Sequence, residues 1–219
     1  MFSGEEYWVD VSFPIQSSKV STNYHWLPHN VDPKNHPVPE EYRNMPIQRL
    51  GDRQKCYEDF MQGCRSYYGD CNATEKDRIS INACQPRSMQ NHTALGFKKI
   101  RAPSALVSLL NDYWNKNKEK KQLEEWFVGN SYANIWDSPT YMISVDDTSL
   151  EGAGQELEEK ISNATQNIIE QWTGMELRLT SLYGIRMYTE GSVLSPHVDR
   201  LPLVSSAIVN VAQDVDEDW

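Results

Sequence analysis

Residues 181–211, SLYGIRMYTEGSVLSPHVDRLPLVSSAIVNV, contain the pattern that decides how this chain is interpreted. His197 and Asp199 stand two residues apart in it. Side chains at i and i+2 of an extended strand point to the same side, so this imidazole and this carboxylate can converge on one point. They match two ligands of the 2-His-1-carboxylate site that holds ferrous iron. The triplet therefore predicts metal ligands; the alternative is a solvated histidine and aspartate at the end of a strand.

The residues around this triplet predict strands on both sides of it. Side chains alternate along residues 182–188 with the period of two that is typical of a strand. Glu190 and Gly191 predict the turn that follows, and Pro196 favours an extended backbone before the triplet. Residues 204–211 are rich in β-branched side chains and predict a second strand.

This order of strand, turn, metal-ligand pair and strand resembles the first half of the double-stranded β-helix of 2-oxoglutarate/Fe(II) oxygenases. It is more closely similar to the prolyl 4-hydroxylase catalytic domain, where Tyr-x-x-Gly precedes His-x-Asp, as Tyr188, Gly191, His197 and Asp199 do here. The segments SPTYMISVDDTSL, EWFVGNSYANIW and EKDRISINACQPRSMQNHT resemble a subgroup of such proteins from diatoms and related algae. In that subgroup the resemblance extends over most of the chain, from about Val9 onward.

The resemblance implies hydroxylation of peptidyl proline with Fe(II), 2-oxoglutarate and ascorbate. It implies that His197 and Asp199 are metal ligands and that Tyr188 donates a hydrogen bond to the distal carboxylate of the cosubstrate. Ser206 and Arg186 are further candidates for cofactor binding. Arg186 lies on the same side of the expected strand as Tyr188, and a charge that points into a barrel needs an anionic partner.

The resemblance also implies residues that this sequence does not match. In the family, a distal histidine and then a basic residue complete the site, and neither follows the triplet before Trp219. We therefore expect an α+β fold in which helices pack on an incomplete jelly-roll sheet, and a chain of 219 residues that is inactive alone. The alternatives are a non-catalytic structural subunit or glycoprotein of a larger assembly and, third, a module that binds carbohydrate or peptide.

Composition narrows the class of protein. The chain has 39% hydrophobic and 24% charged residues, which is typical of a globular protein. A formal net charge of −10 argues against a nucleic-acid-binding surface, and the basic run at residues 116–121 is expected at the exposed end of a helix. No apolar run approaches the ~18 residues of a membrane span. The resemblance implies a peptidyl-proline substrate protein as the partner, and the alternative function implies a larger protein assembly.

Cysteines and sequons indicate an oxidising compartment. The spacing of the cysteines lacks the paired C-x2-C of zinc sites, so disulfides are expected, with three possible connectivities. The cysteines are Cys56, Cys64, Cys71 and Cys84. The candidate glycosylation sites are Asn72, Asn91 and Asn163. Together they predict the secretory pathway, in the lumen of the endoplasmic reticulum, another oxidising lumen or the extracellular space.

The sequence predicts three parts. Residues 1–50 form an extended arm rich in aromatics and proline, with a short strand at residues 7–13 and three histidines that lack zinc spacing. Residues 51–100 form the cysteine-bearing segment, with a helix at residues 54–67. Residues 101–219 hold a helix capped by Ser104, a strand at 140–145, a helix at 157–172 ended by Gly174, and the expected barrel strands.

Overall fold

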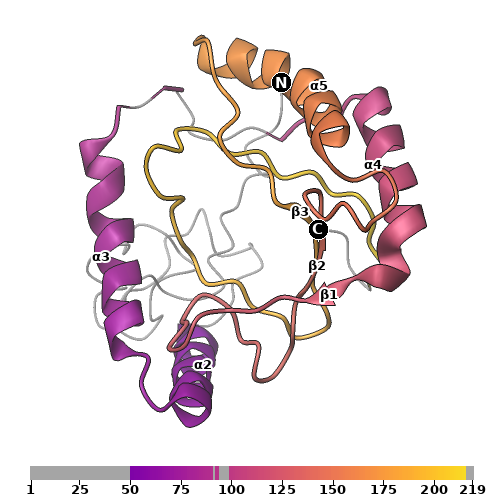
Figure 1. Ribbon diagram of the computed structural model, residues 1–219. Helices are drawn as coiled ribbons and strands as arrows, with labels where there is room; N and C mark the ends of the chain where they lie inside the picture. The colour runs from indigo at the N-terminus through magenta and orange to yellow at the C-terminus, as the bar shows by residue number, and fades with distance from the viewer. Residues whose placement is uncertain (1–49, 91, 94–98, 216–219) are drawn as a thin grey trace, which may run out of the picture. The chain divides into compact units, whose positions relative to one another are not determined.

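The computed structural model describes residues 50–90, 92–93 and 99–215 (Figure 1). The expected arm, its short strand, the histidines within it and the sequon at Asn91 lie outside these ranges. The described fold is α+β, as predicted, with α-helices and one small antiparallel sheet. Among the helices that the structure describes, none combines the length and apolar character that a bilayer span requires.

The described residues divide into two compact units. Unit 1 comprises residues 50–88, 126–138 and 190–198, and unit 2 comprises the other described residues. The loops of unit 1 therefore cluster with the cysteine-bearing helices, although the sequence suggested that they belong to the C-terminal part. The boundary between the units falls between Val198 and Asp199, inside the triplet that the sequence singled out.

Unit 1 is built on two helices, α2 (Leu50–Tyr68) and α3 (Asn72–Ser88). The first confirms the helix predicted at residues 54–67. The second gives helical structure to a segment that the sequence left open between helix and loop. Asp70 Oδ1 accepts a hydrogen bond of 2.9 Å from the backbone N–H of Asn72, which satisfies one of the unpaired donors at the start of α3. Figure 1 shows both helices at the indigo and purple end of the colour bar.

A small apolar core holds the loop 126–138 against α2. Phe60, Met61 and Cys64 are buried on one face of α2. Trp136 packs edge-on against Phe60, with 5.1 Å between the ring centroids. A Cβ atom at Gly63 would lie 2.1 Å from Trp136 Nε1, so a glycine is required where the indole crosses the helix.

One disulfide is present among the described cysteines. It joins Cys64 to Cys71 across the turn between α2 and α3, with 6.2 Å between their Cα atoms. Cys84 is free and exposed, which corrects the expectation that it is part of a disulfide. Cys84 stands thirteen residues beyond Cys71, roughly 20 Å along a helix, so it cannot reach this pair. The side chain of Cys56 lies outside the description.

Unit 2 is a three-stranded antiparallel sheet with two packed helices. Its sheet has the order β1 (Gln122–Leu123), β2 (Tyr141–Ser144) and β3 (Gly184–Met187). The register places Ile143 opposite Ile185. Strands β2 and β3 confirm the predictions for residues 140–145 and 182–188. Helices α4 (Ser104–Asn117) and α5 (Gln155–Thr173) pack against each other, as Figure 1 shows, and a 3-10 turn, η5 (Lys118–Lys120), follows α4.

The core of unit 2 is apolar and follows the predicted helical spacing. Its buried residues are Leu106, Leu110, Tyr113, Ile143, Val145, Leu150, Leu157 and Ile161. Those on the helices recur at steps of three and four residues, which places them on one face. Helix α5 ends as predicted, because Gly174 adopts a left-handed φ of 70° and donates to the carbonyl of Glu170 at 2.8 Å.

The prediction for the start of α4 was wrong by one residue. Ser104 is the first helical residue and not the cap, and the cap residue is Pro103. Pro103 has an extended ψ of 138°, and its carbonyl accepts the N–H of Val107 at 3.0 Å. Proline reaches this geometry without a side-chain hydrogen bond because its ring already fixes φ.

The second strand predicted after the triplet is not formed. Residues 204–211 have no regular secondary structure, which corrects that prediction. Val209 and Val211 pack partly against the core of unit 2, whereas Ile208 is 98% exposed. A β-rich composition becomes a strand only where a neighbouring strand pairs with its backbone. The jelly-roll sheet expected from the sequence remains a prediction, since the described sheet has three strands.

Candidate functional site

His197 lies in unit 1 with its imidazole exposed. Its Nδ1 atom is 2.8 Å from the carbonyl oxygen of Ser195. A carbonyl oxygen can only accept, so Nδ1 carries the proton and the lone pair of the neutral ring is on Nε2. Metal-binding histidines are commonly oriented in this way, by a hydrogen bond from the ring nitrogen that does not bind the metal. The ring of Tyr132 packs edge-on against the imidazole at 5.9 Å.

Helix α3 supplies a buried ion pair whose arginine is bonded to the backbone next to this histidine. Arg78 is 1% exposed and Glu75 is 5% exposed. Arg78 donates from Nη2 and Nε to the two carboxylate oxygens of Glu75, at 2.6 and 2.8 Å. Tyr57 of α2 donates a further hydrogen bond of 2.9 Å to Glu75. Burial, followed by the charge of Glu75, raises the pKa of Tyr57 and keeps its hydroxyl a neutral donor.

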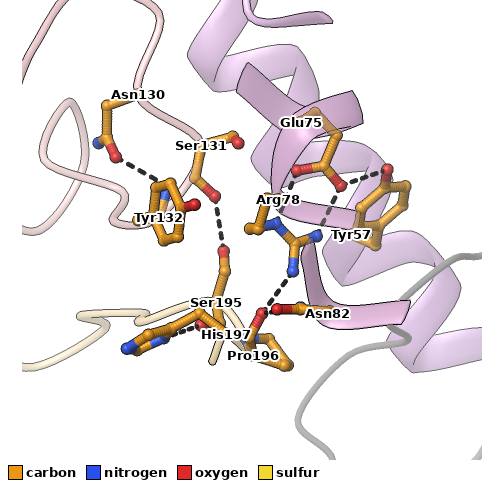
Figure 2. Close-up of polar contacts among 10 residues, drawn as sticks. All are labelled: Tyr57, Glu75, Arg78, Asn82, Asn130, Ser131, Tyr132, Ser195, Pro196 and His197. Carbon is orange, nitrogen blue, oxygen red and sulfur yellow. Dashed lines mark hydrogen bonds and ion pairs between the residues drawn. The ribbon is translucent and has the colours of Figure 1, made fainter. Parts of the chain in front are cut away.

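Two side chains of α3 hold the backbone on either side of His197 (Figure 2). Arg78 Nη1 and Asn82 Nδ2 both donate to the carbonyl of Pro196, at 2.6 and 2.7 Å. Asn82 Oδ1 accepts the N–H of Val198 at 3.0 Å. We call Arg78 and Asn82 the α3 bracket. It provides the donor and acceptor that an adjacent strand would otherwise provide to this segment.

A second carboxamide binds the same segment upstream. Asn134 Nδ2 donates to the carbonyl of Gly191 at 2.9 Å, and its Oδ1 accepts the N–H of Val193 at 2.6 Å. The turn predicted at Glu190 and Gly191 is present, and Gly191 has a φ of 77°. A Cβ atom there would lie 2.7 Å from Ser138 Oγ, so both conformation and space favour glycine.

Ser195 ties the segment to the loop 126–138. Its N–H donates to the carbonyl of Tyr132 at 2.7 Å, and its hydroxyl donates to the carbonyl of Ser131 at 2.8 Å. Asn130 fixes that loop in turn, because its Oδ1 accepts the N–H of Tyr132 and its Nδ2 donates to the carbonyl of Ala133. Figure 2 shows the hydroxyl of Ser195 directed at Ser131.

Asp199 lies in unit 2 and is exposed. Its Oδ2 accepts a hydrogen bond from the hydroxyl of Ser206. Ser206, suggested by the sequence as a cofactor-binding residue, therefore contacts the carboxylate of the triplet. Within the described ranges, no group of three or more His, Cys, Asp or Glu side chains is close enough together to hold a metal ion.

Arg186 has a carboxylate partner in its own unit. Its Nη2 and Nε donate to Glu124 Oε1, at 2.5 and 3.1 Å. Thr140 donates to the other oxygen of Glu124 at 2.7 Å. The hydroxyl of Tyr188 also interacts with the guanidinium. The anion that the sequence required for Arg186 is therefore Glu124, and a role for Tyr188 toward a cosubstrate stays a prediction.

Sequence reasoning missed the residues that support His197. Glu75, Arg78 and Asn82 recur at three- and four-residue steps, so they lie on one face of α3. That polar stripe was the available signal, but it is informative only once the segment is known to be a helix. Among the predicted glycosylation sites, Asn72 at the start of α3 and Asn163 on α5 are exposed, as a glycan requires.

No protein-family model matches the chain, and neither the curated proteins nor the solved structures contain a match to it.

Proposed function

We propose that this chain carries two of the iron ligands, His197 and Asp199, of a prolyl 4-hydroxylase-like 2-oxoglutarate/Fe(II) oxygenase. The observation that carries the proposal is the hydrogen bond from His197 Nδ1 to the carbonyl of Ser195. It gives Nε2 the lone pair that a metal ligand needs. Ser206 donates a hydrogen bond to Oδ2 of Asp199, the other proposed ligand.

The residues of the chain have distinct roles in this proposal. The carbonyl of Ser195 keeps the imidazole in one tautomer, and Ser206 orients the carboxylate. When bound, Fe(II) and 2-oxoglutarate supply the oxidising power that hydroxylates a carbon of the substrate. The resemblance implies a third ligand, a distal histidine, which no residue of this sequence matches. The proposed substrate is a peptidyl proline in the secretory pathway, with ascorbate as reductant, and the Cys64–Cys71 disulfide is compatible with that oxidising compartment.

The test is a metal titration of the wild type and two ligand variants. Under anaerobic conditions, we expect Fe(II) to bind the wild-type chain. We expect the affinity for Fe(II) to fall at least about 100-fold in His197→Ala and in Asp199→Ala, because removing a group that only hydrogen-bonds to a metal ligand already costs about 10- to 100-fold. His92→Ala removes a histidine outside the triplet and is the matched control. Succinate release from 2-oxoglutarate in the presence of a proline-rich peptide then tests turnover. Equal Fe(II) affinity in the wild type and His197→Ala would contradict the proposal.

A second candidate function is a non-catalytic subunit of a larger assembly. The observation in its favour is the exposed apolar stretch after the triplet, where Leu201 is 58%, Val204 44% and Ile208 98% exposed. Such side chains are typical of a surface that another protein covers. If this function holds, Ile208→Asp lowers the molar mass measured by light scattering, and the wild type binds no Fe(II). A molar mass that Ile208→Asp leaves unchanged argues against it.

A further inference from the structure

We propose that Asn82 and Arg78 are positioning residues for His197. They act through the backbone and do not touch the metal. The consequence for metal affinity rests on the proposed function, whereas the consequence for the orientation of the imidazole does not. The result is that a helix more than a hundred residues upstream in the sequence sets the direction of the histidine lone pair.

The carbonyl before the histidine and the N–H after it both bind side chains of α3, and Val198 is 116 residues from Asn82 in the sequence. Holding the peptide groups on both sides of a residue restricts its φ and ψ, and those angles restrict the side-chain rotamer. Figure 2 shows the bracket on one side of the segment and the imidazole directed away from it.

The tautomer of His197 depends on the hydrogen bond that its Nδ1 atom donates. The hydrogen bond from Nδ1 to the carbonyl of Ser195 limits the rotation of the ring and keeps the proton on Nδ1. Ser195 is itself held by its N–H and hydroxyl bonds to the loop 126–138. If the α3 bracket is lost, Pro196 and Val198 can rotate relative to Ser195. The Nδ1 hydrogen bond then weakens, and the proton redistributes between the two ring nitrogens.

Arg78 bonds two different partners at once. A guanidinium has five N–H donors in a planar fork. Arg78 uses Nε and Nη2 for Glu75 and Nη1 for Pro196. The small ammonium group of a lysine cannot span both partners in this geometry. The residue therefore couples the buried ion pair of α3 to the backbone beside His197.

The chain provides its own matched control. Asn134 makes the same pair of hydrogen bonds as Asn82, one to a carbonyl and one to the N–H two residues later. It encloses Ser192, which is no candidate ligand. Asn82→Ala and Asn134→Ala thus remove the same chemistry from the same segment of unit 1. A merely structural role predicts similar effects of both variants on His197.

The experiment measures the tautomer and the metal affinity in the wild type, Asn82→Ala and Asn134→Ala. With ¹⁵N-labelled histidine, the His197 signals are assigned by His197→Ala. We expect the Nδ1–H tautomer in the wild type and in Asn134→Ala, and a mixture with the Nε2–H tautomer in Asn82→Ala. With Mn(II) as the probe, we expect affinity to fall about 10- to 100-fold in Asn82→Ala and less than about 3-fold in Asn134→Ala.

The outcomes separate this inference from the proposed function. If the wild type binds no Mn(II), the proposed function fails, and the tautomer measurement still decides the inference. If Asn82→Ala and Asn134→Ala give the same tautomer and the same affinity, the inference fails. Arg78→Lys is the second variant should Asn82→Ala not fold. It retains the charge beside Glu75, and a mixed tautomer is expected again, whereas an unchanged Nδ1–H tautomer overturns the inference.

Discussion

The cores of the two units differ in chemistry. Among the side chains that the structure describes, the hydrophobic cluster of unit 2 has eight buried residues, whereas that of unit 1 has four, two of which are the cysteines of the disulfide. Unit 1 instead buries polar side chains that bind one another and the backbone. They include Glu75, Arg78, Asn130, Asn134, Ser138 and Ser195.

Because of this difference, the two units place different requirements on their sequences. Apolar packing is non-directional, so unit 2 requires side chains of suitable volume on the correct face. A buried polar group must find its own partner, so unit 1 depends on individual donors and acceptors. The candidate metal-binding histidine lies in the unit whose interior is directional. This is consistent with a site that needs a side chain held in one orientation.

The largest expected effect comes from breaking the buried ion pair of unit 1. Arg78→Met leaves the carboxylate of Glu75 buried without its cation, which costs about 3–5 kcal/mol. The free energy of unfolding in urea measures this loss. Arg65→Met, which removes an exposed arginine from α2, serves as the control and is expected to cost under about 0.5 kcal/mol. A loss below about 1 kcal/mol for Arg78→Met would mean that the pair is not a determinant of unit 1.

Next in size is a cavity in the apolar core of unit 2. Leu106 is 1% exposed, and Leu106→Ala is expected to cost about 3 kcal/mol, mainly as lost transfer energy plus an unfilled cavity. Leu123→Ala, at a leucine that is 58% exposed, is the control with little effect. Hydrogen exchange should show faster exchange in α4 and α5 and unchanged exchange in α3. Equal acceleration in α3 would show that the two cores are not independent.

The disulfide gives a somewhat smaller effect, confined to unit 1. It closes a short loop, with a sequence separation of 7, and removing it with the double change Cys64→Ala and Cys71→Ala is expected to cost about 2.5 kcal/mol. Cys84→Ser is the matched control because that thiol is free and exposed. Urea unfolding with and without reductant measures the loss. A reductant effect that persists in the double variant would contradict the assignment.

The smallest effect concerns one hydroxyl in unit 2. Burial and then the charge of Asp147 raise the pKa of Tyr113 to about 12, and its hydroxyl donates to the carbonyl of Ser144 at 2.6 Å. Since the folded pKa exceeds the unfolded value, this contribution to stability is complete below pH 10 and is lost as the pH rises toward 12. Absorbance of tyrosinate should show one fewer late-titrating tyrosine in Tyr113→Phe than in the wild type, because the pKa of Tyr57 is raised in both. Titration of every tyrosine near pH 10 would contradict it.

Much of unit 2 could be predicted from the sequence. The apolar steps along residues 157–172, the left-handed position of Gly174 and the alternation along residues 182–188 are all local signals. Such signals depend on residues within one or two turns of each other. For the same reason, the helix at residues 54–67 was predicted although its partners were unknown.

Part of the candidate site could likewise be predicted from the sequence, and part of it could not. The sequence by itself determined that an imidazole and a carboxylate stand two residues apart after a tight turn at Gly191. Only the tertiary structure decided that Cys64 pairs with Cys71, that residues 204–211 form no strand, and that Arg78 and Asn82 hold the backbone around His197. The physical reason is distance along the chain. Periodicity records which residues share a face of an element, but it does not say which residue more than a hundred positions away will bond to that face.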